Sequence, residues 1–288
     1  MRMTYSYYNI ANITLAILAD SLFEEALPNY IPFRVTAAPL ADITLLLGSD
    51  VSIHGKEIHA FESDYMHYRF LKGADSSYII EFFDVNTAHT YLLETNAKCL
   101  LCKTNIKTSF ENCFVLNNML MVAFAFGAIH HNVLLFHASA VEHNGQAAIF
   151  LGKSGTGKST HAALWINYIQ NSTMINDDNP AVRIEPKNHR VYGTPWSGKM
   201  TCFRQNNFPL RSIIRLEQSS QNKIEPLTPV KALAAVLPSC SVMHWETSDY
   251  NKVYDLIAEL IVDLPVFTLH CLPNKAAAEM AAETLKKE

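Results

Sequence analysis

The stretch GKSGTGKST, residues 152–160, orders glycines, lysine and hydroxyl residues in a way that suits phosphate binding. It fits the pattern G-x-x-x-x-G-K-[ST] in full, from Gly152 through Gly157, Lys158 and Ser159. Glycines let the backbone approach phosphates closely, loop amides and the next helix's N-terminus add a positive field, and the lysine reaches the outer phosphate oxygens. The chain has only 10 glycines, so this clustering disfavours a chance match. The candidate nucleotide-binding residues are Gly152, Lys153, Ser154, Gly155, Thr156, Gly157, Lys158, Ser159 and Thr160.

Two adjacent carboxylates, Asp177 and Asp178, follow the apolar run TMIN. A serine hydroxyl such as that of Ser159 and a carboxylate are hard oxygen ligands that suit Mg²⁺. One aspartate can hold the metal, and the other can accept the proton of an attacking hydroxyl. A solvated turn is the alternative interpretation of an acidic pair, but the position after a buried strand beside a phosphate loop favours function.

A register argument links His137 to the loop. Asn144–Gly145 lies between the apolar runs VLLFHASAV and AAIFLG, which is the pattern of a two-residue β-hairpin turn. Partner numbers on the two strands then sum to 289, so His137 stands opposite Gly152. A slip of one residue would move His137 to the other face. We therefore expect His137 to face the phosphate site; the alternative is a core histidine with a backbone partner.

The segment after the loop predicts a helix and then a strand. Ala162, Trp165, Ile166 and Ile169 follow the spacing of one buried helix face, and TMIND reads as a strand. The order strand, glycine loop, helix, strand is the context that the motif requires. A helical crossover makes the two strands parallel, so the loop and the aspartates should meet at one edge of the sheet.

The residues FHASAVEHNGQAAIFLGKSGTGKST followed by INDD resemble the catalytic domain of HPr kinase/phosphorylase and its relatives. The resemblance implies the α/β fold of the phosphoenolpyruvate carboxykinase superfamily, with a mixed sheet. It also implies phosphate binding by residues 152–159, base catalysis by Asp177, and metal binding by Ser159 and an aspartate, which we take to be Asp178. His137 matches the family histidine near the phosphate. A glycine-containing second signature of that family is replaced here by LEQSSQNK, so the acceptor stays open.

The segment GTPWSGKMTCFR, residues 193–204, reads as a loop because Gly193, Pro195 and Gly198 interrupt it. Trp196, Lys199 and Arg204 are its candidate substrate-contacting residues. Trp196 suits stacking on a base or closing a substrate pocket. The alternative is an ordinary surface loop with a packing tryptophan.

The rest of the chain predicts a second domain. Short runs such as ITLLLG, MHYRFL, YIIEFF, TYLLE and KCLLCK are typical of an antiparallel sheet. We predict a small β-rich domain over residues 1–108, with a helix near its start, and a nucleotide-binding domain over residues 109–288 that begins with a helix at about 111–130.

Composition narrows the possible partners. The formal net charge is −4, which gives no support to nucleic-acid binding. The most apolar stretch, residues 119–129, is expected to be a buried helix, too short to cross a bilayer. The six cysteines are scattered, and Cys99 and Cys102 lack a second ligand pair, so we expect free thiols in a reducing cytoplasm and no zinc site. A homo-oligomer is left open.

The sequence thus predicts a cytoplasmic enzyme that transfers a phosphoryl group from ATP, or another phosphate donor, with Mg²⁺. The acceptor is a hydroxyl, such as a serine of a protein or peptide or free serine. A nucleotide-binding regulatory module with little catalysis is the alternative, and carboxykinase-type chemistry is a third option.

Overall fold

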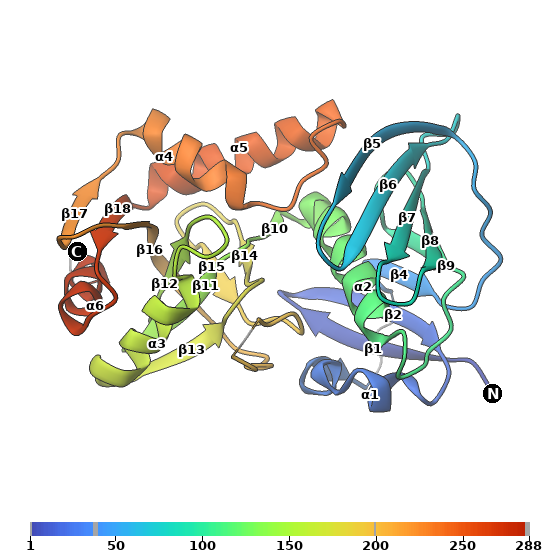
Figure 1. The fold of residues 1–288 in the computed structure, drawn as a ribbon, viewed down its shortest axis with the longest axis horizontal. Coiled ribbons are helices and arrows are strands. Elements are labelled where there is room, and N and C mark those ends of the chain that lie inside the picture. The colour runs from blue at the N-terminus through green and yellow to red at the C-terminus, as the bar shows by residue number, and fades with distance from the viewer. Residues whose placement is uncertain (1, 37–39, 199, 286–288) are drawn as a thin grey trace. The chain divides into compact units, whose positions relative to one another are not determined.

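The structure is a computed structural model, and it describes residues 2–36, 40–198 and 200–285. It divides into two compact units (Figure 1). Unit 1 comprises Met1–His131 and the short segment Met243–Glu246, and unit 2 comprises Asn132–Val242 and Thr247–Glu288. Both contain large sheets, so the chain is a mixed α/β protein.

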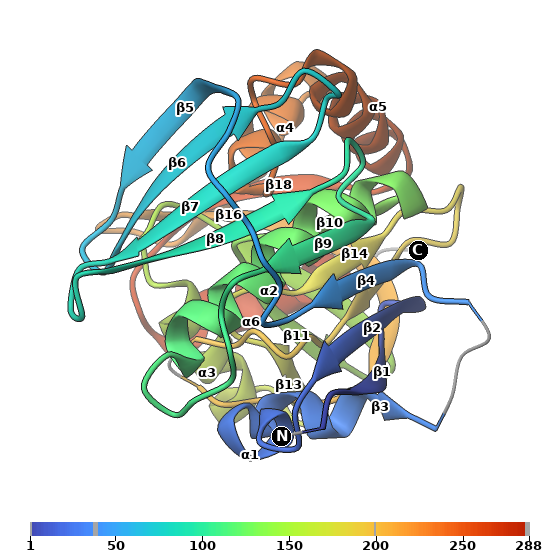
Figure 2. The ribbon, with the colours of Figure 1, turned by 90° about the vertical axis from the view of Figure 1, so that its right-hand side faces the viewer.

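Unit 1 is built on a nine-stranded sheet of order β3-β1-β2-β4-β9-β8-β7-β6-β5, and Figure 2 shows its strands in this sequence. Its strands are β1 (Thr4–Ile10), β2 (Ile13–Ala19), β3 (Arg34–Val35), β4 (Ile43–Leu46), β5 (Lys56–Glu62), β6 (Met66–Lys72), β7 (Tyr78–Asp84), β8 (His89–Thr95) and β9 (Leu101–Thr104). Its helices are α1 (Phe23–Ala26), α2 (Cys113–Ala128), and the 3₁₀ segments η1 (Pro28–Phe33) and η2 (Ile129–His131).

The start of unit 1 contains the expected helix, but the helix is short and a hairpin precedes it. The helix α1 has only four residues, and β1 and β2 form the hairpin. Ala11 and Asn12 both have positive φ, as a tight hairpin turn requires, and they bring the two strands into register. The sheet is also mixed rather than antiparallel, because β4 runs parallel to both β2 and β9.

The apolar stretch around residues 119–129 lies in α2. Together with η2 it forms a 19-residue segment, Cys113–His131, that is long and apolar enough by length and composition to cross a membrane. The expectation that it is too short is therefore wrong. Its expected burial is found, since 61% of the most apolar window is buried in the protein.

Unit 2 holds a second sheet of order β10-β14-β15-β16-β12-β11-β13, with β18 paired to β16 and β17 to β18. Its strands are β10 (Val133–Leu135), β11 (Ser139–His143), β12 (Gln146–Leu151), β13 (Ser172–Asn176), β14 (Ala181–Arg183), β15 (Arg190–Tyr192), β16 (Asn207–Gln218), β17 (Lys223–Pro226) and β18 (Val266–Cys271). Its helices are α3 (Lys158–Tyr168), α4 (Pro229–Val236), α5 (Thr247–Asp263) and α6 (Lys275–Ala282), with the 3₁₀ segments η3 (Leu237–Ser239) and η4 (Glu283–Leu285).

The β11–β12 hairpin has the predicted register. Ser139 pairs with Phe150 and His143 with Gln146, so partner numbers sum to 289. Regular pairing begins at Ser139, two residues after His137. Strand β11 also pairs antiparallel with β13, so β12 and β13 run in the same direction with β11 between them, and their C-terminal ends share one edge of the sheet.

Helices α3 and α6 pack against each other and against the strands of unit 2. The cluster between them contains Phe150, Trp165, Ile214, Leu269 and Ala281, each buried. This packing fixes where α3 starts, and therefore where the glycine loop lies relative to the ends of β11, β13, β16 and β18.

Candidate phosphate-binding site

The predicted phosphate loop forms the turn between β12 and α3. Gly155 and Gly157 have φ of +79° and +105°, and a Cβ built on either would meet no atom within 4 Å. Backbone conformation, not crowding, is therefore what calls for glycine at both positions. Gly157 is the N-cap of α3, and the first amide N–H groups of a helix have no partner within the helix. This turn consequently offers donors to an anion.

The remaining loop residues keep the turn in shape and line its outer side. The amide and the hydroxyl of Thr156 both donate to the carbonyl of Lys153, at 3.1 and 2.7 Å. The loop residues on the surface are Lys153, Ser154, Gly155 and Thr160, while Ser159 is half-buried.

Lys158 is held beneath this turn. Its residue is 8% exposed, and its ammonium lies 2.9 Å from the Gly152 carbonyl oxygen and 2.9 Å from His137 Nε2. Burial lowers the pKa of Lys158, and the carboxylates of Asp178 and Asp177 oppose that shift. The cation is thus fixed at the inner edge of the loop before any ligand arrives.

The contacts of His137 define its protonation pattern. An ammonium group has only hydrogens to donate, so Nε2 of His137 accepts from Lys158 and carries no proton. In the neutral ring the proton is then on Nδ1, which lies 3.2 Å from Asp178 Oδ1. Asp178, His137 and Lys158 therefore form a continuous polar series, with the His137 side chain 48% exposed. The glycine loop, His137 and the aspartates, which the sequence analysis expected at one edge of the sheet, thus lie together.

The two aspartates have different surroundings. Asp177 is 2% exposed; its Oδ1 accepts from the Ser139 hydroxyl at 3.1 Å and its Oδ2 from the Met200 amide at 3.0 Å. The side chain of Asp178 is 37% exposed and faces His137. Asp177 is thus fixed from both sides, whereas Asp178 is open to the site.

Two residues that organise the aspartates were missed by the sequence analysis. Buried Asn176 accepts at Oδ1 from the amides of Asp178 and Asn179, at 2.9 and 2.8 Å, and donates from Nδ2 to the carbonyl of Trp196 at 3.1 Å. Ser139 orients Asp177. A signal for Ser139 was present, since it lies two residues after His137 and therefore on the same face of an extended chain.

A family model described as "ScmC: SynChlorMet cassette protein ScmC" matches residues 100–272, which is more than half of the chain. The chain belongs to this family. The matched ScmC segment contains the glycine loop, Lys158, His137 and both aspartates, so the whole site lies within it.

No curated protein matches the chain. Among solved structures, the chain is similar to the Hpr(Ser) kinase/phosphatase from Coxiella burnetii. The sequence identity is 10%, the alignment covers 53% of this chain and 88% of that chain, and the TM-score is 0.33. The chemistry of the ScmC-family site therefore depends on its own side chains.

The loop of residues 193–204 lies against the aspartates. A Cβ on Gly198 would come within 3.1 Å of both the Asp177 carbonyl and the Asp178 Cβ, so glycine allows the loop to lie close to both residues. Trp196 is 2% exposed, so its indole packs inside the protein instead of presenting a surface for stacking on a base. Arg204 is exposed, and Lys199 lies outside the described residues.

The donor set fits a divalent cation that arrives with phosphate. Among the residues that the structure describes, no group of three or more His, Cys, Asp and Glu side chains is arranged to hold a metal. Ser159 and Asp178 are both partly exposed oxygen donors. Mg²⁺ is commonly bound through one or two carboxylates plus substrate phosphates, which is the arrangement these residues suit.

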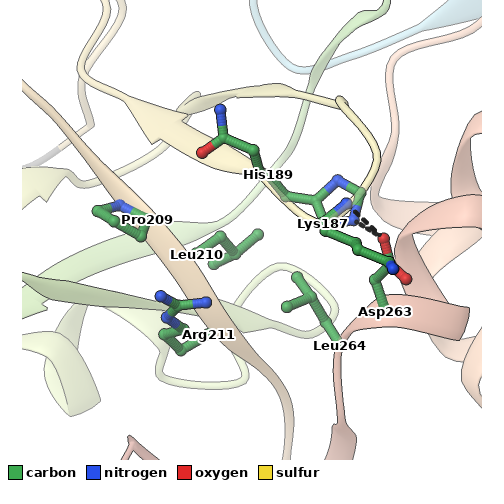
Figure 3. A pocket seen from close by; sticks show the side chains of 8 residues that line it. Lys187, His189, Pro209, Leu210, Arg211, Asp263 and Leu264 are labelled. Atoms are coloured by element: carbon green, nitrogen blue, oxygen red, sulfur yellow. Dashed lines mark hydrogen bonds and ion pairs between the residues drawn. The ribbon is translucent and has the colours of Figure 1, made fainter.

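A separate cavity in unit 2, of about 190 Å³, lies between β15, β16 and the end of α5. Figure 3 shows Asp263 directed at His189, and their Oδ2 and Nε2 atoms lie 3.0 Å apart. The Lys187 amide donates to the same oxygen, and together with His189 it lowers the pKa of Asp263. These contacts anchor the turn before β15 to the end of α5.

Proposed function

We propose that this protein transfers the terminal phosphoryl group of a nucleoside triphosphate, ATP in the first instance, to a hydroxyl acceptor with Mg²⁺. The observation that carries the proposal is the position of Lys158. Its ammonium is buried under a complete glycine loop and linked through His137 to the open carboxylate of Asp178. A cation, loop amides and a carboxylate at one sheet edge are the parts that phosphoryl transfer requires.

The loop and Lys158 would bind the phosphates. The contact of Lys158 with the Gly152 carbonyl holds the ammonium near the loop, and phosphate oxygens are stronger acceptors for it than a neutral ring nitrogen. Ser159 and Asp178 would hold the metal. When bound, Mg²⁺ neutralises the charge on the outer phosphate oxygens and orients them.

We assign Asp177 as the general base that accepts the hydroxyl proton. Ser139 and the Met200 amide fix its carboxylate, and the loop of residues 193–204 that supplies Met200 is where an acceptor would dock. The Met200 hydrogen bond to Oδ2 would then give way to the acceptor hydroxyl. His137 would hold its proton on Nδ1 toward Asp178 and keep Lys158 in place.

The hydrogen bonds of Asp177 support a second candidate. Both Asp177 oxygens accept hydrogen bonds, and a protein in which they stay so engaged would bind nucleotide without accepting a proton from an acceptor. A nucleotide-binding regulatory module would therefore keep the loop and lose the base.

The first prediction concerns the cation. Lys158→Ala should abolish binding of ATP with Mg²⁺, because it removes the positive charge that meets the phosphate oxygens. Isothermal titration calorimetry on wild type and variant measures this, with Lys187→Ala as a control at a lysine far from the loop in sequence. Equal affinities in wild type and Lys158→Ala would disprove the phosphate-loop assignment.

The second prediction concerns the base. Asp177→Asn should keep ATP binding but lower phosphoryl transfer by roughly 10²-fold or more, since an amide cannot accept the proton. Transfer to serine, peptides and cell extract is followed with labelled ATP, alongside hydrolysis. Full activity of Asp177→Asn would reject the assigned role, and binding without turnover in wild type would favour the regulatory module.

A further inference from the structure

The glycine loop has two sides with different chemistry. Strand β12, which leads into the loop, lies between β11 and β16 in the sheet. The β11 side carries His137 and, through β13, the two aspartates. The β16 side continues into β18, and the carboxylate at its strand ends, Glu217, is ion-paired with Arg215 at 3.0 Å. The groups assigned to metal binding and proton acceptance thus lie on the β11 side of the loop.

A cavity of about 520 Å³ lies on the β16 side. Its walls come from the glycine loop, the first turns of α3, and the ends of β16 and β18. Much of the surface is apolar, supplied by Leu164, Leu216, Leu272 and Pro273. A flat ring with polar edges suits such walls, because ligand sites are mostly apolar with a few polar groups that fix orientation.

A neighbouring cavity of about 430 Å³ also borders the loop but has a different lining. Lys153, Arg215 and Glu217 contribute charged side chains there. Gln218 lines both cavities and donates to the carbonyls of Gly155 and Thr156 at 3.4 Å. If the loop holds the phosphates of a ligand, the less polar part of that ligand is therefore expected in the cavity of about 520 Å³, whose walls are more apolar.

His161 gives this cavity a polar group that requires a partner. The indole N–H of Trp165 donates to His161 Nε2 at 3.3 Å. Because an indole nitrogen donates only, Nε2 carries no proton, and the ring proton is on Nδ1. That Nδ1 is buried and has no hydrogen-bond partner in the described part of the chain. An unsatisfied buried donor is costly, and His161 is one of the residues that line the cavity.

We propose that this cavity receives the nucleoside part of the triphosphate, with the Nδ1–H of His161 donating to an acceptor atom of its base or sugar. The inference rests on the proposed function, since it takes the phosphates to lie in the glycine loop. It adds that specificity for a nucleotide over a bare polyphosphate resides in Leu164, Leu272 and His161, on the side of the loop away from the aspartates.

Calorimetry with two ligands separates the nucleoside from the phosphates. ATP and inorganic tripolyphosphate, each with Mg²⁺, are titrated into the full chain. Leu272→Trp fills the cavity at a side chain that is 39% exposed, and His161→Phe removes the donor while keeping a ring. Leu101→Trp, at a side chain 43% exposed on β9, is the matched control.

The expected result is a loss confined to ATP. Leu272→Trp should weaken ATP binding about tenfold, as expected when some 1.4 kcal/mol of nucleoside burial is lost, and His161→Phe should weaken it about fivefold through one lost hydrogen bond. Tripolyphosphate affinity should stay unchanged in both, and Leu101→Trp should match wild type.

Three outcomes would overturn the inference. Unchanged ATP affinity in Leu272→Trp and His161→Phe would reject the cavity and leave the phosphate loop standing. Equal losses for ATP and tripolyphosphate would show that the variants act through the loop itself. Wild-type protein that binds neither ligand would reject the proposed function, and the nucleoside site with it.

Discussion

At the scale of single residues, the site depends on two histidines whose neighbours determine where their protons lie. Lys158 makes Nε2 of His137 an acceptor, and Trp165 does the same for Nε2 of His161. His137 is half exposed and faces a carboxylate, whereas His161 is 3% exposed. The His137 ring is therefore open to solvent beside the aspartates, whereas the His161 ring lies within the wall of the cavity on the other side of the loop.

The burial of His161 predicts a pH dependence of stability. Burial lowers its pKa to about 4, below the ordinary value of 6.5. Between these two values the unfolded chain binds a proton that the folded chain excludes, so the free energy of unfolding falls as pH drops below about 6.5. The loss from this group is complete near pH 4 and amounts to about 3 kcal/mol, from roughly 1.4 kcal/mol per pKa unit.

Urea unfolding of wild type and His161→Phe at pH 7.5, 6.0 and 4.5 measures this effect. The wild type should lose more stability than the variant over this range, because phenylalanine does not titrate. Parallel pH profiles for the two proteins would contradict the prediction.

The residue scale also shows where sequence reasoning succeeds and where it stops. The Asn144–Gly145 turn sets the predicted register as far as Ser139, because strand pairing has a period of two. His137 lies two residues beyond the paired region, and its amide donates to the carbonyl of Ser239.

The position of Asn176 could not be derived in this way. Asn176 orients the aspartates because it accepts from the amides of Asp178 and Asn179 and donates to the carbonyl of Trp196 in a different loop. Such contacts depend on tertiary packing, which the spacing of residues in the sequence does not encode.

At the scale of elements, the glycine turn before α3 and the hairpin turn of β11–β12 invite a comparison. Gly157 and Gly145 both have positive φ, +105° and +81°, and a Cβ on either one would meet nothing within 4 Å. The two substitutions to alanine therefore differ only in which element is strained.

We predict that Gly157→Ala and Gly145→Ala each destabilise the protein by about 1 kcal/mol, the cost of a left-handed conformation for an L-residue. Only Gly157→Ala should weaken ATP binding, since it disturbs the start of α3 and the amides beside it. Urea midpoints and calorimetry measure the two effects, and an equal loss of ATP affinity in both variants would contradict the local role of the loop.

Elements were predictable where the pattern was strong and local. The strands of residues 43–46, 66–72, 78–84 and 89–95 lie within or close to the predicted runs. A helix does lie near the start, as predicted, but it has only four residues, and the β1–β2 hairpin before it was not predicted, because an apolar run such as ITLAILA fits a buried strand as well as a helix. The sequence also did not reveal that the sheet of unit 1 contains parallel strands. A parallel pair such as β2 and β4 is set by tertiary packing and not by a short turn.

At the scale of the whole molecule, the two units are not separated by a single boundary in the sequence. The segment Met243–Glu246 belongs to unit 1 although unit 2 supplies the residues on both sides of it. Trp245 stacks on His59 with ring centroids 4.5 Å apart, and Glu246 accepts from Lys72 and the Tyr78 hydroxyl, each at 2.5 Å. A boundary near residue 108 could not reveal this, because the contacts that bind the segment are distant in sequence.

The three tryptophans allow each unit to be observed separately. Trp165 and Trp196 lie in unit 2, and Trp245 lies in unit 1. In Trp245→Phe, tryptophan fluorescence therefore reports unit 2 alone. The wild type reports both units, so the difference between the two melting curves isolates unit 1.

ATP with Mg²⁺ should raise the melting transition of unit 2 and leave that of unit 1 in place, because only unit 2 contains the glycine loop. A ligand at 100 times its Kd stabilises the unit that binds it by about 2.7 kcal/mol. Multidomain chains commonly unfold in more than one step, which makes the two shifts separable. Equal shifts of both transitions would contradict the prediction and show that the two units unfold as one cooperative body.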